Sequence, residues 1–473
     1  MTTSTENLIQ SIHNAFACLR GIVRDPDEMF QIISRMSLLK WASDNRGNNL
    51  FGNGDIINVP SESTWEYIKK NHQSSQYVIS MALDKLFQEN PWLLNSMDNE
   101  IIKRLLKVHP EISSTMVDIF SYTSFDIEKL PSKSTLGDIF SNININLAYD
   151  IPNSGFAAES VRKLLVSIIN PEDNSIVYDP FLSRGFIHQE VINYIISKES
   201  SIKNLRLLGQ EINYSNHWLA FFIALMYCLR PDYQLSNAFI EPIKNNKNEF
   251  IKADFVISMP PIGVKKWGRE IAQFSNDNIT FRYGLPSSNS GDIAAIEIAL
   301  AHLNENGRCG IITATGVLFR GGSEGDIRKE IINADLVEAV ISLPGGLLFG
   351  SGIPLALIIF NKNKPAERKG KILLVDYSDV KIKRSGPKEL PEEISGEILN
   401  LYEEFKEKTG FARIVSMDEI ASKEYNLNIS GYIQKQIEIE KIEMTEAIEK
   451  IQALESERLE IVSNLMGHLK KFN

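Results

Sequence analysis

An acidic residue follows each of two short apolar segments, at positions where an acid could bind a hydroxylated ligand. Asp179 follows the segment 176–178, and Glu211 follows the segment 206–209. Parallel strands end at one common edge of a sheet, and an acid after the second strand can accept hydrogen bonds from both hydroxyls of a ribose. The spacing therefore favours a ribose-binding role for Glu211 over that of an ordinary surface acid.

The turn after the first segment reads Asp179-Pro180-Phe181-Leu182-Ser183-Arg184-Gly185-Phe186. Nucleotide-binding folds place glycines in this turn because the backbone must approach the ligand without Cβ atoms in the way. Here only Gly185 remains, and Arg184 places a large cation in the turn. Taken alone, this turn indicates an ordinary strand–helix connection.

A second turn is rigid but lacks a polar side chain at its start. The apolar segment Phe255–Ile257 runs into Ser258-Met259-Pro260-Pro261-Ile262-Gly263. Each proline fixes φ near about −65° and removes a backbone donor, so the turn is stiff. The residue that this rigid turn presents is Met259, whose thioether is only a weak hydrogen-bond acceptor.

These turns lie in a region where apolar strands alternate with helical stretches. The expected strands are 176–178, 206–209, 255–257, 309–313, 336–343 and 354–361. The expected helices are 158–169, 186–196, 218–229 and 293–304, the last ending at Asn306-Gly307. This alternation predicts an α/β domain over residues 141–380, built as a doubly wound, Rossmann-like parallel sheet.

The flanking regions are expected to be helical. Residues 1–140 show apolar positions at helical spacing and form an all-α N-terminal domain. Residues 381–432 are expected as a connector with a helix near 392–408, and residues 433–473 as a long C-terminal helix. In that helix Ile437, Met444, Ile451 and Leu465 share a seven-residue period, as do Ala447, Leu454 and Ile461. So narrow an apolar seam predicts a coiled-coil-like partner helix on another subunit.

Composition limits the classes of function. The formal net charge of −10 argues against a chain that grips DNA alone. Lys265, Lys266 and Arg269 are candidates for DNA contact, with a solvated loop surface as the equal alternative. Three scattered cysteines and histidines without ligand spacing predict a reducing cytoplasm and no metal site. No signal peptide or membrane-spanning segment is expected.

Several blocks along the chain carry a specific resemblance. They are Leu19-Arg20-Gly21, Gly209-Gln210-Glu211-Ile212-Asn213, Gly316-Val317-Leu318-Phe319-Arg320-Gly321-Gly322, Glu324-Gly325 with Arg328, Leu343-Pro344, Ile353-Pro354 and Asn426-Leu427-Asn428-Ile429-Ser430. In their types and shared order they resemble the modification (methyltransferase) subunit of type I restriction-modification systems. That family consists of adenine-N6 DNA methyltransferases, and the resemblance covers essentially the whole chain.

The resemblance implies S-adenosylmethionine as methyl donor, a helical N-terminal domain that clamps DNA, and a C-terminal helix that docks on the specificity subunit. A restriction nuclease subunit is a further expected partner. The catalytic turn is then Met259, Pro260, Pro261 and Ile262, and DNA contacts are Lys265, Lys266 and Arg269. Expected cofactor contacts are Phe156, Asp179, Gly185, Glu211 and Asn237.

The chain departs from the family at four places that contact cofactor or base. The family's Asn before Pro-Pro is Met259, and the aromatic after it is Ile262. The glycine-rich turn has become 182–185, and a Tyr-Thr-Pro sequence corresponds to Phe156-Ala157-Ala158. These changes predict weak or absent cofactor binding and impaired methyl transfer. Three functions stay open: a silent DNA- and partner-binding subunit, an active adenine-N6 methyltransferase with an unorthodox acceptor, and a binder of another adenosine-containing ligand.

Overall fold

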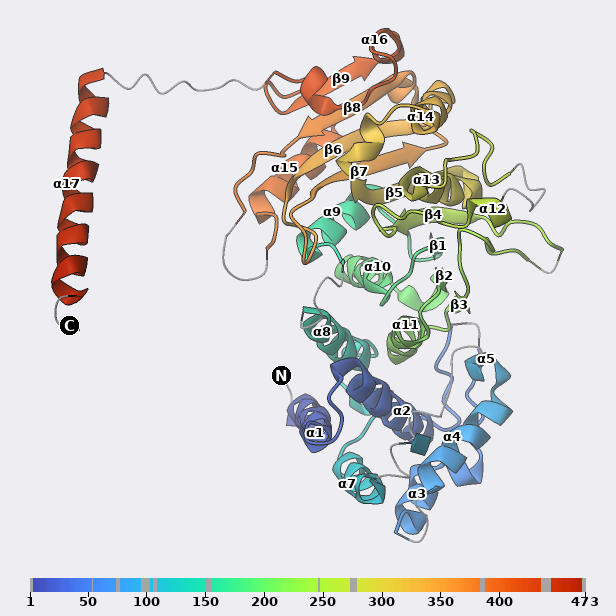
Figure 1. Cartoon of the computed structure of the whole chain (residues 1–473). Helices are drawn as coiled ribbons and strands as arrows, with labels where there is room; N and C mark the ends of the chain where they lie inside the picture. Colours follow the sequence, from blue (N-terminus) through green and yellow to red (C-terminus); the bar gives the residue numbers. More distant parts are fainter. Residues whose placement is uncertain are drawn as a thin grey trace. The chain divides into compact units, whose positions relative to one another are not determined.

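The computed structural model describes residues 3–52, 54–73, 77–94, 103–104, 109–149, 155–245, 247–272, 279–382, 388–434 and 444–469. Residues Met1–Ile433 form one compact unit, and Gln434–Asn473 form a second (Figure 1). The expected seam residue Ile437 lies outside the described residues.

The described part of the first 140 residues contains helices and no strand, as predicted. Its longest helix, α2, begins where Asp25 accepts a hydrogen bond from the Asp27 N–H at 2.9 Å and Pro26 occupies the first turn. The last helix, α8, runs past the expected boundary at residue 140. The helices are α1 Thr3–Leu19, α2 Pro26–Asp44, α3 Trp65–Asn71, α4 Val78–Glu89, α5 Pro91–Leu94, α7 Pro110–Ser121 and α8 Thr135–Tyr149.

The described residues form a nine-stranded sheet in the order β3-β2-β1-β4-β5-β7-β6-β8-β9. The first five strands in this order run parallel, as do β6 and β8, whereas β7 and β9 run antiparallel to their neighbours. The strands are β1 Ile176–Asp179, β2 Arg206–Glu211, β3 Asp232–Leu235, β4 Ala253–Ser258, β5 Leu303–Ala314, β6 Val337–Gly345, β7 Pro354–Asn361, β8 Lys371–Asp376 and β9 Ala412–Ser416. The mostly parallel sheet confirms the predicted α/β fold class.

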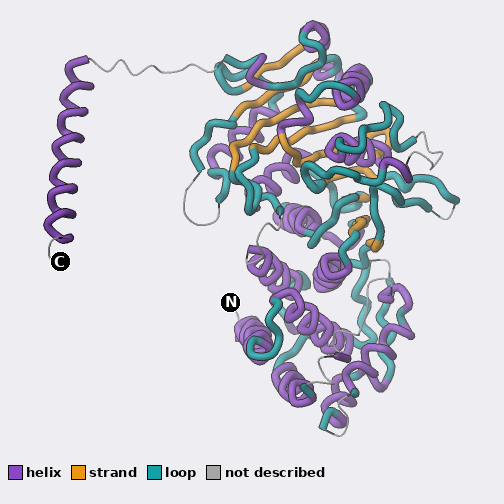
Figure 2. Tube along the Cα trace, viewed as in Figure 1, coloured by secondary structure: helices purple, strands orange, loops and turns teal. Residues whose placement is uncertain are grey.

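Helices cover both faces of this sheet (Figure 2). Neighbouring side chains of β4 show the division, because Val256 and Ile257 point to opposite faces and enter different cores. One face carries α9 Glu159–Ile169, α10 Phe186–Ser197, α11 Tyr214–Met226 and α15 Glu392–Glu403; the other carries α13 Gly291–His302 and α14 Ser323–Asn333. Because helices cover both faces, the carboxyl ends of the parallel strands are the part of the sheet open to a ligand.

Three strands and one helix end differ from the predictions. β3 and β9 are short, and more than half of their residues are not fully buried, so they lack the apolar run that marks a strand; β8 was also missed. The helix expected over 293–304 ends at His302, and β5 starts at Leu303, so Asn306-Gly307 lies inside a strand and the predicted helix stop was wrong. Sheet pairing of Ala253 with Leu303 extends the strand to this point.

The segment expected as a connector contributes to the sheet. Its β9 pairs with β8, and its helix α15 packs on α9. The remaining short helices of the unit are α12 Arg269–Ala272 and α16 Met417–Ser422. Short 3-10 turns span Ser61–Ser63, Ile127–Lys129, Ile202–Asn204, Thr315–Leu318, Ala366–Arg368 and Ile429–Gly431.

The second unit contains α17 Met444–Leu469, in agreement with the long helix predicted there. Apolar side chains of this helix, including Ile451, Leu454, Ile461 and Leu465, are more than half exposed. Within the described part of the chain, none of the helices has the length and apolar character needed to cross a membrane.

Candidate functional site

The predicted site residues come together where β1, β2 and β4 end. Asp179 pairs with Gly209 in the register of β1 and β2, and Tyr178 pairs with Val256 in that of β1 and β4. The parallel register therefore places Asp179, Glu211 and the Met259 turn at the same, carboxyl-terminal end of these three strands.

Asp179 joins two of the turns at this edge. Its carboxylate is buried, accepts a hydrogen bond from the Ser258 hydroxyl, and accepts another from the Phe181 N–H at 3.0 Å. Burial raises the pKa of Asp179 to about 7, although the two hydrogen bonds favour the charged form; the Glu211 carboxylate adds a smaller upward effect. The hydrogen bond from Ser258 links the end of β1 to the end of β4 through the Asp179 side chain.

Glu211 lies at the end of β2 with an exposed apolar neighbour. Burial raises the pKa of Glu211, while its carboxylate accepts from backbone N–H groups of Asn213 (2.6 Å), Ser183 and Ile212. The Ile212 side chain is 70% exposed, a suitable surface for a flat ring beside the ribose acceptor. Sequence reasoning named Glu211 and missed Ile212, although an apolar residue directly after a strand-end acid was the available signal.

The turn after β1 adopts a glycine-like backbone with a serine in it. Ser183 has a φ of 49°, in the left-handed region where glycine avoids a steric cost, and Gly185 has a φ of 79°. A Cβ on Gly185 would lie 3.0 Å from the Cβ of Ala220, so this glycine also permits close packing of α11. The substitution at Ser183 therefore sits at a position whose conformation favours glycine.

The Arg184 side chain leaves this turn. Its buried guanidinium donates from Nε to the Asn144 side-chain oxygen at 2.8 Å and from Nη1 to an Asp27 oxygen at 2.7 Å. The large cation expected in this turn instead points out of it, because acceptors on α8 and α2 pair with the guanidinium. Arg184 fastens the turn to the N-terminal helices.

Asn237 lies just beyond β3, on the side of β2 away from β1. Its side-chain oxygen accepts from the Phe239 N–H at 3.0 Å, while the Ser236 N–H donates to the Glu211 carbonyl at 3.0 Å. The structure therefore places Asn237, an expected cofactor contact, near Glu211. The side-chain oxygen of Asn237 already accepts a hydrogen bond within its own turn.

Met259 packs into an aromatic cluster. It lies half-buried against the cluster of Phe156 and Phe186, on which Phe349 also packs. The rings of Phe156 and Phe349 stack with centroids 5.2 Å apart and planes inclined by 15°. A thioether fits this apolar and aromatic surrounding.

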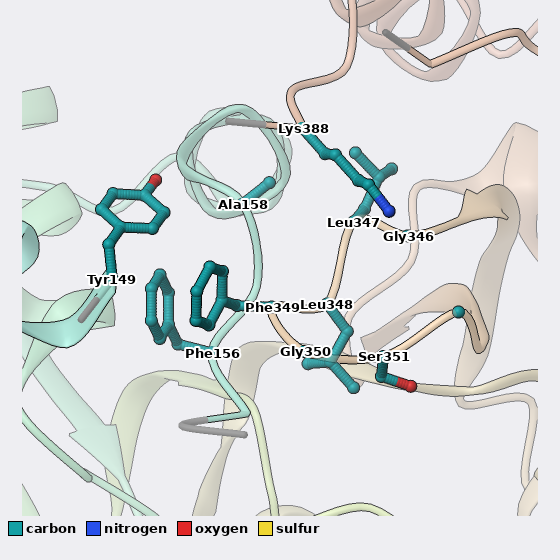
Figure 3. A pocket seen from close by; sticks show the side chains of 11 residues that line it. Tyr149, Phe156, Ala158, Gly346, Leu347, Leu348, Phe349, Gly350, Ser351 and Lys388 are labelled. Carbon is teal, nitrogen blue, oxygen red and sulfur yellow. The ribbon is translucent and has the colours of Figure 1, made fainter. Parts of the chain in front are cut away.

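The stacked rings line a cavity of about 540 Å³. Figure 3 shows Tyr149, Phe156 and Phe349 on one side of it and Lys388 on another. The glycine-rich segment 346–352 forms much of the remaining wall. The Phe349 N–H donates a hydrogen bond to the Phe156 carbonyl at 2.9 Å, which fixes the position of Phe349. The sequence places Phe156 at the site but does not indicate Tyr149, at the end of α8, or Phe349, which lies far away in the chain between β6 and β7.

The helix start at Ala157-Ala158 is capped from a distant part of the chain. α9 has no side-chain cap of its own, and the Glu389 carboxylate accepts from the Ser160 N–H at 2.8 Å and the Glu159 N–H at 3.3 Å. A carboxylate suits the positive end of a helix. Glu389 therefore supplies the cap that the N-cap residue Ala158 lacks.

The basic residues lie in the loop that follows the Pro-Pro turn. Lys265 and Lys266 are exposed. The backbone N–H of Lys266 donates a hydrogen bond to the Ser288 carbonyl at 2.6 Å. Arg269 donates from Nε to the Pro286 carbonyl at 3.0 Å, so part of its guanidinium orders the loop.

Replacing Asp179 by Asn is expected to change how stability depends on pH. The pKa is raised from 3.8 to about 7 in the folded chain, so the folded chain binds this proton more tightly than the unfolded chain. The wild-type free energy of unfolding therefore loses up to about 4 kcal/mol as pH rises from about 4 to about 7. Asp179→Asn removes this loss and keeps an acceptor for Ser258.

Urea unfolding at about pH 5, 6.5 and 8 measures the effect. We expect the Asp179→Asn variant to be more stable than wild type at pH 8, with the difference shrinking towards pH 5. A difference that stays constant across these pH values would contradict the raised pKa.

Comparison with known proteins places the chain in a family. Residues 132–441 match the family described as N-6 DNA Methylase. The type I restriction enzyme MjaVIII methylase subunit of Methanocaldococcus jannaschii is 30% identical over 421 residues, covering 83% of this chain and 69% of that protein. The HindI methylase subunit of Haemophilus influenzae is 26% identical, covering 79% of this chain and 88% of that protein.

Solved structures show the same fold. The type I restriction-modification system methyltransferase subunit from Streptococcus thermophilus superposes with a TM-score of 0.74 at 19% identity, covering 91% of this chain and all of that chain. A chain from a structure on complex assembly and conformational transition of the type I system gives a TM-score of 0.65 at 19% identity, with both chains fully covered. The chain therefore belongs to the N-6 DNA methylase family and, within it, to the methylase subunits of type I restriction enzymes.

Proposed function

We propose that this chain is a DNA- and partner-binding subunit of a type I restriction-modification or phage-defence system in which methyl transfer is impaired or absent. The observation that carries the proposal is Met259 at the end of β4, packed against Phe156 and Phe186 where the family has an asparagine. DNA, a specificity subunit and a nuclease subunit are its proposed partners.

The loss of the amide removes chemistry that the turn backbone cannot replace alone. The side-chain carbonyl of an asparagine would accept a hydrogen bond from the target amino group and orient the lone pair of that group, whereas a thioether does neither well. Removing one group that acts in a transition state typically lowers a rate by about 10²–10³. Ile262 also forgoes aromatic stacking, worth about 1–3 kcal/mol per base.

The cofactor surface is retained in part. Glu211 and the exposed Ile212 fit the adenosine portion of S-adenosylmethionine, which when bound would supply the methyl group. The turn beside them carries Ser183 in a glycine-like conformation, and Glu211 already accepts several backbone N–H groups. These features support weak cofactor binding and leave open another adenosine-containing ligand.

An active methyltransferase is the second candidate function. The cavity beside Met259 favours it, because Tyr149, Phe156 and Phe349 offer aromatic surfaces that could replace the ring lost at Ile262. Pro260 and Pro261 also keep the turn rigid.

Calorimetric titration with S-adenosylmethionine and with adenosine separates these functions. We expect no saturable heat with S-adenosylmethionine at concentrations up to about 1 mM. Such a result would mean a dissociation constant above about 1 mM, which corresponds to a binding free energy weaker than about 4 kcal/mol. Saturable heat that disappears in Glu211→Gln would overturn the claim of impaired cofactor binding. Saturable heat with adenosine but not with S-adenosylmethionine would favour a binder of another adenosine-containing ligand.

DNA binding is tested by its salt dependence. Lys265→Ala/Lys266→Ala is expected to weaken binding to duplex DNA and to lower the slope of log affinity against log salt by about 1.8, because each phosphate contact contributes about 0.9. The control is Lys369→Ala/Lys371→Ala, near the start of β8 and thus at the opposite edge of the sheet. Equal slopes for wild type and both variants would assign the basic cluster to a solvated surface.

Partner docking is tested on α17. Leu454→Glu/Ile461→Glu adds two charges on the apolar seam, whereas Ser456→Glu/Ser463→Glu adds two charges about 200° around the helix. We expect the first pair of changes to abolish co-purification with a co-expressed specificity subunit and the second to leave it unchanged. Equal retention of the specificity subunit by both variants would refute docking through the seam.

A further inference from the structure

The turn that carries Met259 is fastened to the start of α13. The Gly263 N–H donates to an Asp292 carboxylate oxygen at 2.6 Å, and the Gly291 N–H donates to the Val264 carbonyl at 3.2 Å. A Cβ on Gly291 would lie 2.6 Å from the Val264 carbonyl oxygen, so the absence of a side chain there allows the close approach. The position of the turn thus depends on Asp292.

Asp292 is in turn held by an arginine from another strand end. Its carboxylate is 3% exposed, and its second oxygen accepts from the Arg320 Nη1 at 3.0 Å. A Cβ on Gly316 would lie 2.5 Å from the Arg320 guanidinium, so this glycine leaves the space that the guanidinium occupies. Arg320 also approaches Glu324, at the longer distance of 3.7 Å.

A second arginine anchors the segment that supplies Arg320. Arg328 donates from Nη1 to the carbonyls of Val317 (3.0 Å) and Arg320 (2.8 Å), and from Nε to the Tyr425 carbonyl at 2.9 Å. The Leu427 N–H adds a bond to the Leu318 carbonyl at 2.8 Å. Residues 425–427 therefore fix residues 317–320, and through Arg320 and Asp292 they reach the Met259 turn.

From this chain of contacts we infer that Arg320 is a positioning residue for the Met259–Gly263 turn, acting through Asp292. A buried carboxylate is stable only with a partner that balances its charge. Without Arg320 the Asp292 carboxylate gains stability by turning to solvent, and the Gly263 N–H loses its acceptor. The inference rests on the proposed function only in assigning DNA as the ligand that the positioned turn meets.

Hydrogen exchange of a peptide spanning 259–268 tests this inference in the full chain without DNA. We expect exchange at Gly263 to be at least about tenfold faster in Arg320→Gln, partly restored in Arg320→Lys, and unchanged in the control Glu324→Gln, which removes only the more distant partner. Unchanged exchange in Arg320→Gln would overturn the inference. So would an equal increase in peptides of α2, which would indicate general destabilisation.

A double variant distinguishes positioning from a merely structural role. Asp292→Asn keeps an oxygen for the Gly263 N–H but needs no counter-charge, so Asp292→Asn/Arg320→Gln is expected to restore slow exchange relative to Arg320→Gln. Failure of this rescue would also overturn the inference. If wild type protects Gly263 yet binds no DNA, the positioning stands and the proposed function fails.

Discussion

The hydrogen bond from the Ser258 hydroxyl to the buried Asp179 carboxylate joins the turn after β1 to the turn after β4. The Phe181 N–H bonds to the same carboxylate, so the ligand turn begins in a fixed place, and Met259 follows Ser258 directly. This hydrogen bond joins Ser258 and Asp179 and does not involve the Met259 side chain.

The site separates into a retained frame and an altered centre. Arg184 ties the ligand turn to the N-terminal helices, Glu389 caps α9, and Asp292 holds the Pro-Pro turn. These contacts are polar and specific, and they keep the shape of a methylase subunit. Under the proposed function, the positions that would meet the reacting amino group and the base hold the apolar residues Met259 and Ile262.

The sequence was sufficient for the elements with a strong local pattern. β1, β2 and β4 are apolar runs that end in turn residues, so their positions and the meeting of Asp179, Glu211 and Met259 were predictable. β3 and β9 were missed because their stability comes from pairing with neighbours and not from their own composition.

Contacts between residues far apart in the chain could not be predicted either, because they too depend on neighbours that a local pattern does not record. Glu389 lies 230 residues from Glu159, and the direction of the Arg184 side chain depends on acceptors in α2 and α8. The partnership of Phe156 with Phe349 requires the β6–β7 hairpin to fold against the start of α9. No local pattern in a single sequence records such pairings.

We propose that the polar contacts of the site are intact while the methyl-transfer step is impaired. Radiolabelled S-adenosylmethionine is added to duplex DNA with the chain and its specificity subunit, using a preparation shown to bind that DNA. On this proposal we expect no label on adenine above background for wild type and a measurable gain in Met259→Asn/Ile262→Phe. Label transferred to adenine by wild type, and lost in Pro260→Ala, would contradict it.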